Sequence, residues 1–288
     1  GLSVPRSLER KIETNLRRGE FHRCNGENCK EIANMRSIHT IYIREMLKQA
    51  PEGLEGLHSR VHTASPNPRV KTTLEDALGR LGCESAEDGL LLELNDAGTS
   101  LQATAGGKVY GDEQLLAICC QQEVQAGCDL ALPYNAPEML DTLASQAGQS
   151  TLRYLHTPAD QSDSPARRLS AKQIWVRDGL FRAVKLLHII KSTGKSLAEL
   201  SAELPDFYVE KKSFALPCSP AHLQELLRRS DTQLDAASEG VILRKHGGRI
   251  LITPGKSGKR AQVFAEANTM ELAHELCEDV ALLLQNNQ

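Results

Sequence analysis

Short apolar stretches and amphipathic stretches alternate along most of this chain, and their order limits the folds open to it. Residues 57–63 show a strand pattern, Val70–Leu81 shows a helix pattern, and Leu90–Leu94 shows a second strand pattern. Residues 101–110 then predict a hairpin, and a further helix starts at Leu115. Strands and helices of this length in this order are typical of an α/β domain with a mixed sheet.

The strand and helix pattern restarts near residue 126. Leu130–Pro133 and Thr151–His156 predict strands, and Ala136–Ala147 predicts a helix between them. Residues 157–171 are rich in Ser, Pro and Asp, which predicts a loop. A strongly amphipathic helix follows at Asp178–Lys191. These elements indicate a second α/β domain.

The last part of the chain has a different order of predicted secondary-structure elements, with several strands and few helices. Strands are predicted at Tyr208–Leu216, Gly240–Leu243, Arg249–Thr253 and Gln262–Ala267, with a final helix at Thr269–Gln285. Ser219 and Pro220 are placed to cap and to start one more helix that ends at Arg229. Hairpin strands followed by a helix indicate an α+β domain with an antiparallel sheet.

We therefore predict two α/β domains with mixed sheets followed by an α+β C-terminal domain with an antiparallel sheet. The predicted boundaries are a helical linker at 1–35 and three domains at 36–125, 126–204 and 205–288.

Composition excludes several classes of protein. The net charge is −3, without the basic excess that nucleic-acid binding requires, and no apolar run approaches the length of a membrane span. The eight cysteines form no CxxC pair, and Cys24 and Cys29 have no second pair to complete a zinc site. Unpaired thiols predict a cytoplasmic protein.

Two Gly-Lys-Ser triplets resemble part of a phosphate-binding P-loop. The full motif needs a glycine five residues before the second glycine, and those positions hold Ile189 and Ile250. Gly194 and Ser196 are better explained as a helix stop followed by a helix cap.

The basic segment Thr253–Arg260 joins two predicted strands and carries three cations and two glycines. Its backbone N–H groups and cations could bind a phosphate, or the segment could be a solvated basic loop. The segment TASPNP at 63–68 also has two explanations: Ser65 could act as a nucleophile, or the segment could be an ordinary capped turn.

Five segments in order resemble the α-D-phosphohexomutases, beginning with LEDALGRLGC at 74–83 and GGKVYGDEQLLAICC at 106–120. Residues 132–158, 177–218 and 247–276 continue the resemblance, which covers almost the whole chain and rests on their collinear order. It implies the second, third and fourth domains of a family that transfers phosphate between positions of a hexose through a phosphoserine, with Mg²⁺ nearby.

The resemblance also implies four sites, and this chain departs from the family pattern at each. The phosphoserine domain has no counterpart, although Ser65 lies in a similar loop and stays a candidate catalytic residue. The metal loop, DGDGDR in the family, reads LNDAGTSL at 94–101 and keeps only Asp96. No sugar-recognition loop is found between Pro158 and Arg177.

The fourth site is the phosphate loop, RPSGTEP in the family and TPGKSGK at 253–259 here. Thr253 stands in place of the phosphate-binding arginine, while Ser257 keeps a hydroxyl group and Lys256, Lys259 and Arg260 keep positive charge. These five residues are the candidate phosphate-binding set.

We therefore expect a catalytically impaired phosphohexomutase-like protein of carbohydrate metabolism that binds a hexose phosphate or has a regulatory or assembly role. The alternative is an active phosphoglucomutase or phosphomannomutase, with Ser65 or a missing domain supplying the phosphoserine. No cofactor is expected unless the mutase reaction survives, in which case Mg²⁺ is required. Residues 6–24 resemble the segment that precedes such modules in fusions with a sugar-nucleotidyltransferase, so we expect a piece of a longer polypeptide.

Overall fold

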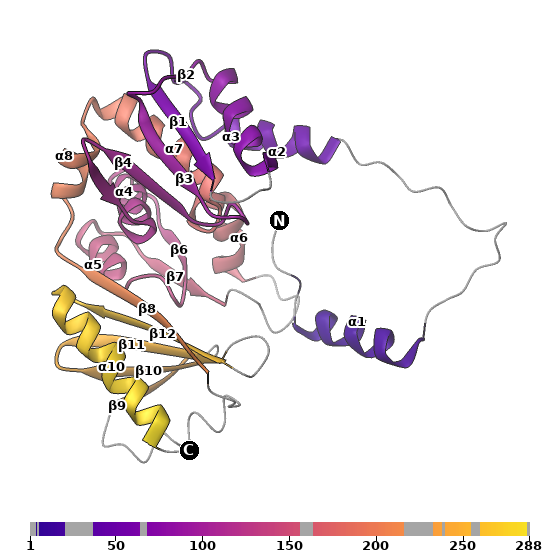
Figure 1. Ribbon diagram of the computed structural model, residues 1–288, viewed down its shortest axis with the longest axis vertical. Coiled ribbons are helices and arrows are strands. Elements are labelled where there is room, and N and C mark those ends of the chain that lie inside the picture. Colours follow the sequence, from indigo (N-terminus) through magenta and orange to yellow (C-terminus); the bar gives the residue numbers. More distant parts are fainter. Residues whose placement is uncertain are drawn as a thin grey trace. The chain divides into compact units, whose positions relative to one another are not determined.

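The computed structural model describes residues 4, 6–20, 37–63, 68–155, 164–215, 233–237, 240–254 and 260–286. The chain forms two compact units, each made of two separate stretches of sequence (Figure 1). Unit 1 comprises Gly1–Gln122 and His156–Ala202, and unit 2 comprises Glu123–Leu155 and Glu203–Gln288. The predicted three-domain division, with boundaries at 36, 126 and 205, stays a prediction.

Unit 1 contains a mixed five-stranded sheet with the strand order β2-β1-β3-β4-β5. Strand β1 (His58–Thr63) runs parallel to β2 (Glu84–Ser85) and to β3 (Leu90–Leu94). The antiparallel strands β4 (Leu101–Ala105) and β5 (Lys108–Tyr110) form the predicted hairpin. The mixed sheet confirms the predicted fold class for this part of the chain.

The longer helices of unit 1 lie close to where the periodicity placed them, with one exception, and the short 3-10 helix of this unit was not predicted. They are α1 (Arg6–Arg18), α2 (Ser37–Leu47), α3 (Pro68–Arg80), α4 (Asp112–Gln125), α6 (Pro165–Lys172), the short 3-10 helix η2 (Ile174–Val176), α7 (Gly179–Thr193) and α8 (Leu197–Ala202). Helix α3 packs on β1, α7 packs on β3 and β4, and the two helices contact each other and α2. Together they form a layer over the sheet.

The exception is α6, because a loop was predicted over residues 157–171. The prediction is wrong from Ser164 onward. The Ser164 hydroxyl accepts a hydrogen bond from the backbone N–H of Arg167 (3.2 Å), and Pro165 occupies the first helical turn. A serine followed by a proline is therefore a helix cap and start here rather than a turn.

Helix α7 has buried residues along most of its length, and both of its ends are capped; the stop at Gly194 was predicted from the sequence, whereas the cap at Asp178 was not. The Asp178 carboxylate accepts from the backbone N–H groups of Leu180 (3.0 Å) and Phe181 (3.2 Å). Gly194 ends the helix in the left-handed conformation, at φ 66°. Ser196 then caps α8 and exchanges hydrogen bonds with Glu199.

Unit 2 combines a short parallel pair of strands with a five-stranded antiparallel sheet. Strands β6 (Leu130–Pro133) and β7 (Thr151–Tyr154) flank α5 (Met139–Gln146). The antiparallel sheet has the order β8-β12-β11-β10-β9, formed by β8 (Tyr208–Ala215), β9 (Gln233–Ala237), β10 (Gly240–Lys245), β11 (Gly248–Pro254) and β12 (Arg260–Ala267). It confirms the predicted α+β class of the C-terminal part.

Helix α10 (Met270–Asn286) packs on this sheet through a core of small and aliphatic side chains. The β10–β11 turn is formed by His246 at φ 51° and Gly247 at φ 81°, one residue before the predicted Gly247-Gly248 turn, because Gly248 already belongs to β11. A Cβ atom on Gly248 would lie 2.4 Å from a methyl group of Leu276, so the turn and the helix are in close contact. The helix predicted at 220–229, with its cap at Ser219, lies outside the described residues.

Candidate functional site

The predicted metal loop, residues 95–100, is a tight turn between β3 and β4 that its own side chains hold in place. The Asn95 side-chain oxygen accepts from the backbone N–H groups of Thr99 (2.8 Å) and Ser100 (3.2 Å). The Asn95 amide group donates to the Thr99 hydroxyl (3.0 Å). A single asparagine therefore supplies three hydrogen bonds that fix the turn.

The start of α7 packs against this turn. The backbone N–H of Gly179 donates to the Gly98 carbonyl (2.8 Å). A Cβ atom on Gly179 would lie 3.0 Å from the carbonyl oxygens of Gly98 and Ser100 and 2.9 Å from Leu94. Only glycine fits this close approach, so the turn and the helix start fix each other.

The residues of this turn do not fit a magnesium site. Mg²⁺ in proteins is bound through carboxylates and water in an octahedral shell. The turn offers one carboxylate, Asp96, which is exposed, and the Asn95 oxygen already accepts two backbone hydrogen bonds. Over the described residues, no three His, Cys, Asp or Glu side chains come together in a way that could hold a metal ion.

Of the candidate phosphate-binding set, the structure describes the two residues at the ends of the loop. Thr253 is half-buried on β11, and Arg260 is exposed at the start of β12. The paired strands bring both to the same end of the sheet, where Thr253 pairs with Gln262 and Pro254 with Ala261. Arg260 donates a hydrogen bond from Nε to the Ser213 hydroxyl (3.1 Å).

Several other candidate residues lie outside the described residues. They are Ser65, Lys256, Ser257 and Lys259. Ser65 lies in sequence between the end of β1 at Thr63 and the start of α3 at Pro68. The two alternatives for Ser65, a nucleophile or a residue of a capped turn, both stay predictions. The phosphate-binding role of Lys256, Ser257 and Lys259 also stays a prediction.

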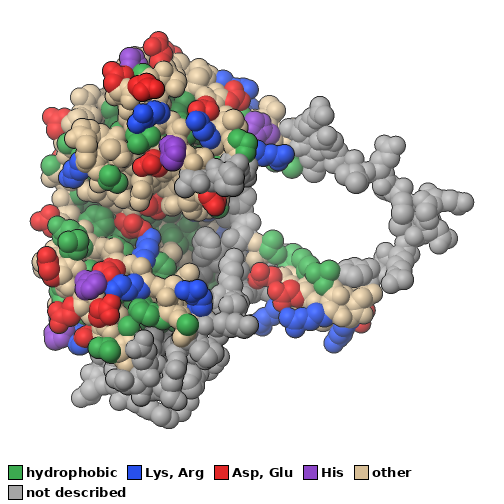
Figure 2. Space-filling model, viewed as in Figure 1, with side chains coloured by type: hydrophobic (Ala, Val, Ile, Leu, Met, Phe, Trp, Pro, Cys, Tyr) green, Lys and Arg blue, Asp and Glu red, His purple; other side chains and the backbone are tan. Residues whose placement is uncertain are grey.

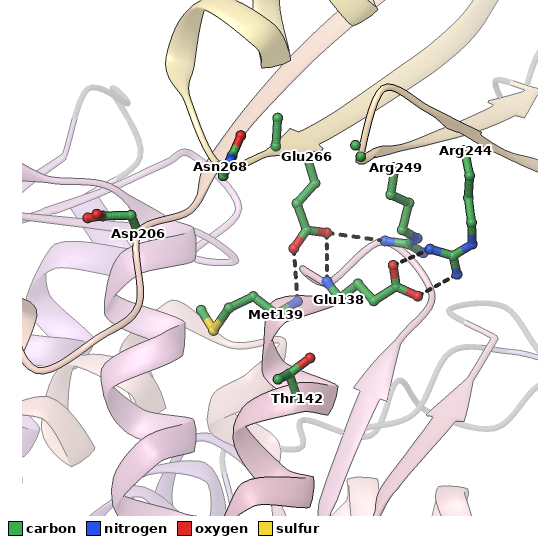
Figure 3. A pocket seen from close by; sticks show the side chains of 11 residues that line it. Glu138, Met139, Thr142, Asp206, Arg244, Arg249, Glu266 and Asn268 are labelled. Atoms are coloured by element: carbon green, nitrogen blue, oxygen red, sulfur yellow. Dashed lines mark hydrogen bonds and ion pairs between the residues drawn. The ribbon is translucent and has the colours of Figure 1, made fainter.

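Unit 2 also contains a cavity of about 270 Å³ that the sequence did not predict (Figure 3). The start of α5, the β10–β11 hairpin and the end of β12 surround it. Its lining residues are Glu138, Met139, Thr142, Asp206, Arg244, Gly247, Gly248, Arg249, Glu266, Ala267 and Asn268.

Glu266 connects β12 to the first turn of α5. Its carboxylate accepts from the backbone N–H groups of Glu138 (2.6 Å) and Met139 (2.9 Å). These are N–H groups that the helix itself leaves without partners, and a carboxylate at a helix N-terminus is also favoured by the helix dipole. Glu266 thus acts as a helix cap supplied from a distant strand.

Two arginines complete this cluster. Arg244 and Glu138 form a two-pronged ion pair, with both contacts at 2.6 Å, which lowers the pKa of the Glu138 carboxyl group. Arg249 is only 10% exposed; it donates to the Tyr134 carbonyl (2.6 Å) and lies 3.7 Å from the Glu266 carboxylate. Burial, and then the neighbouring Arg153, lower the pKa of Arg249.

We call Glu138, Arg244, Arg249 and Glu266 the charge clasp. Its two cations are matched by its two carboxylates and by backbone carbonyls, so it does not have the unmatched positive charge that a phosphate site requires. Figure 3 shows the four side chains directed toward one another across the cavity. The clasp therefore has a structural explanation: it joins the start of α5 to the antiparallel sheet.

The chain is similar in sequence to phosphoglucosamine mutases. It is 31% identical over 105 residues to the phosphoglucosamine mutase of Ligilactobacillus salivarius, a match that covers 36% of this chain and 22% of that protein. A probable phosphoglucosamine mutase of Methanopyrus kandleri is 22% identical over 234 residues, which covers 74% of this chain and 51% of that protein. The chain thus spans at most about half the length of these two relatives. No protein-family model matches it.

Solved structures share the fold over more of the chain. A phosphoglucomutase/phosphomannomutase family protein from Burkholderia thailandensis covers 99% of this chain, with a TM-score of 0.68 and 12% identity, and the match spans 71% of that structure. The N-acetylphosphoglucosamine mutase of Aspergillus fumigatus, solved with GlcNAc-6P and magnesium, covers 85% of this chain at a TM-score of 0.55 and 10% identity, over 65% of its own length. No helix in the described part of this chain combines the length and apolar character that crossing a bilayer requires.

Proposed function

We propose that this chain is a phosphohexomutase-like module of the α-D-phosphohexomutase family that no longer carries out the mutase reaction. The sequence similarity to phosphoglucosamine mutases and the fold shared with solved phosphohexomutases support the family relationship. Its role would be to bind a hexose phosphate or to serve in regulation or assembly. We place this role in the cytoplasm, within a polypeptide that also carries a sugar-nucleotidyltransferase domain.

The turn at residues 95–100 is the observation that carries this proposal. In this family the corresponding loop is expected to hold Mg²⁺ through several aspartates. Here Asn95 holds the turn by hydrogen bonds to its own backbone, and Asp96 is the single carboxylate. Without a fixed cation, the charge that develops on a transferring phosphoryl group would lack its main stabilising partner.

Binding of a hexose phosphate, by contrast, does not need a metal ion. Arg260 has five N–H donors, and the contact with Ser213 uses one of them. The neighbouring lysines of the loop at 253–260 add positive charge within the same short stretch of sequence. We therefore assign ligand binding to this end of the antiparallel sheet and not to the charge clasp.

A mutase assay tests the loss of catalysis. The full chain would be incubated with glucose 1-phosphate, mannose 1-phosphate or glucosamine 1-phosphate, with Mg²⁺ and the corresponding 1,6-bisphosphate as primer. We expect no turnover above a protein-free blank, whereas an intact phosphohexomutase run beside it should turn over. Turnover that Ser65→Ala abolishes would refute the proposal and establish the active-mutase alternative.

Thermal melting with the same sugar phosphates tests binding, because a ligand that binds only the native state raises the melting temperature saturably. We expect Arg260→Ala to remove this effect. Arg44→Ala, at an exposed arginine of α2 in unit 1, is the matched control and should keep it. If none of the sugar phosphates shifts the wild-type melting temperature, the binding role is wrong and a regulatory or assembly role is left.

A further inference from the structure

The antiparallel sheet of unit 2 has two faces with different side chains. Four alternate residues of β12 pack into the core beneath α10, namely Ala261, Val263, Ala265 and Ala267. Successive side chains of a strand point to opposite faces, so Arg260 and Gln262 lie on the face away from α10. Both side chains are exposed. This second face is therefore open to solvent at the end where β12 begins.

The α10 side of the sheet is charged, and its charges are matched. Figure 2 shows acidic, basic and histidine side chains mixed over the side of unit 2 that α10 covers. Lys212 of β8 forms an ion pair with Glu278 of α10, and His274 of the same helix lies 3.0 Å from Glu210. These pairs satisfy one another, so this side offers a ligand little unmatched charge.

The open face carries a row of uncharged polar side chains across three neighbouring strands. Gln262 of β12 pairs with Thr253 of β11 on one side and with Ser213 of β8 on the other. Paired residues have neighbouring side chains on one face, so the three side chains form a row roughly 10 Å long. We call these three residues the polar row.

Two members of the polar row have hydrogen-bonding capacity that the fold does not use. Gln262 is exposed and Thr253 is half-buried, and neither side chain hydrogen-bonds to another residue in the described part of the chain. The third member, Ser213, is exposed and accepts the hydrogen bond from Nε of Arg260 (3.1 Å). This contact holds the guanidinium beside the row and leaves its two terminal amino groups to bind two oxygens of a phosphate.

The polar row and Arg260 suit different parts of one ligand. Hydroxyl and amide groups both donate and accept hydrogen bonds, as the hydroxyl groups of a sugar do, and they carry no charge. A guanidinium binds best to an anion with two oxygens. Arg260 lies two residues before Gln262 on β12, roughly 7 Å along the strand, which is close to the extent of a hexose ring with its phosphate ester.

We propose that the polar row recognises the ring hydroxyl groups of a hexose phosphate whose phosphate group binds Arg260. Gln262, at the centre of the row, is the specificity-determining residue, and Ser213 is the residue that positions Arg260. This inference rests on the proposed binding of a hexose phosphate at this end of the sheet. It adds that the protein distinguishes the sugar and does not bind the phosphate group alone.

Isothermal titration calorimetry of the full chain tests the role of Gln262. The wild type should bind glucose 1-phosphate, mannose 1-phosphate or glucosamine 1-phosphate roughly tenfold more tightly than inorganic phosphate. Gln262→Leu removes the amide and should weaken binding of that sugar phosphate roughly three- to tenfold, with inorganic phosphate within about twofold. Gln146→Leu, at an exposed glutamine of α5 in the same unit, is the matched control and should keep both affinities within about twofold.

The outcomes separate this inference from the function on which it rests. If Gln262→Leu keeps the wild-type preference for the sugar phosphate, the polar row does not read the sugar, whereas binding at Arg260 stands. A wild type that binds inorganic phosphate as tightly as every sugar phosphate overturns the inference in the same way. If the wild type binds none of the four ligands, the inference and the proposed binding function are both wrong.

A pair of variants tests the positioning role of Ser213. Ser213→Ala removes the acceptor for Nε of Arg260 and should weaken inorganic phosphate and the sugar phosphate alike, each by roughly threefold or more. Ser213→Thr keeps a hydroxyl group and should restore most of the affinity, with the same far-UV circular dichroism spectrum as the wild type. Phosphate binding that Ser213→Ala leaves unchanged would show that Arg260 does not depend on this contact.

Discussion

Replacing Glu266 by alanine should destabilise unit 2 far more than an ordinary surface substitution would. The carboxylate is 13% exposed, accepts two backbone hydrogen bonds at the start of α5 and lies 3.7 Å from Arg249. Its removal leaves two helix N–H groups without their partner and a mostly buried guanidinium without one of its counter-charges.

The magnitude follows from these contacts. Loss of a helix cap costs about 1 kcal/mol, and each partly buried N–H group left unpaired adds roughly 1 kcal/mol. We expect a total of about 2–4 kcal/mol. In a unit of about 120 residues, this corresponds to a fall in melting temperature of roughly 10 °C.

The assay should separate the two units. Far-UV circular dichroism follows the unfolding of both units. The single tryptophan, Trp175, lies in unit 1, so its fluorescence reports on the unfolding of that unit alone. Hydrogen exchange of the peptide that contains α5 localises the effect. Glu275→Ala, which removes an exposed carboxylate from α10 in the same unit, is the matched control and should change the stability by less than 0.5 kcal/mol.

The outcome that would refute the reasoning is equally specific. If Glu266→Ala behaves like the control, or if the α5 amides keep their protection in the variant, the contacts of Glu266 do not stabilise the helix start. Glu266→Gln should have a stability between those of the wild type and Glu266→Ala, because an amide oxygen accepts hydrogen bonds but carries no charge.

Three further outcomes follow from contacts described above or from burial. Asn95→Ala removes the three hydrogen bonds of the turn at 95–100 and should lower the stability of unit 1 by about 1–2 kcal/mol, measured by Trp175 fluorescence on heating. Arg182→Met should cost about 2–4 kcal/mol in the same measurement, because Arg182 is 2% exposed and its loss removes the ion pair with Asp112 and the hydrogen bonds to the Trp175 and Val176 carbonyls. Burial raises the pKa of the Cys277 thiol to about 11, so this thiol should resist alkylation at pH 8. The exposed thiol of Cys128 should react first, as measured by mass spectrometry after timed labelling. Faster labelling of Cys277 than of Cys128 would contradict this prediction.

Features that depend on neighbours in sequence could be predicted from the sequence. The stop at Gly194 and the cap at Ser196 use residues within one helical turn, and the β10–β11 turn has Gly247 in the left-handed region. Helix α6 could have been predicted by the same local rule, since Ser164 and Pro165 cap and start it. The serine-rich composition of the surrounding residues favoured a loop and concealed that signal.

The charge clasp could not be predicted in this way. Glu266 and the helix that it caps are separated by 128 residues, and Arg244 is 106 residues from Glu138. No local pattern distinguishes these charged residues from others on strands and helix starts. The turn at residues 95–100 lies between the two cases. Its single carboxylate, Asp96, can be read from the sequence, whereas the hydrogen bonds of Asn95 within the turn are visible only in the structure.

The long separation between α5 and its cap has a consequence for how the protein is made. At a translation rate of about 5–20 residues per second, Glu266 leaves the ribosome roughly 6–25 seconds after Glu138. During that interval β6, α5 and β7 exist without the strand that caps the helix, while residues 156–202 of unit 1 are synthesised in between. Unit 2 is thus completed only after Glu203–Gln288 has been synthesised, and until then its first segment is open to binding by chaperones or to pairing with another nascent chain.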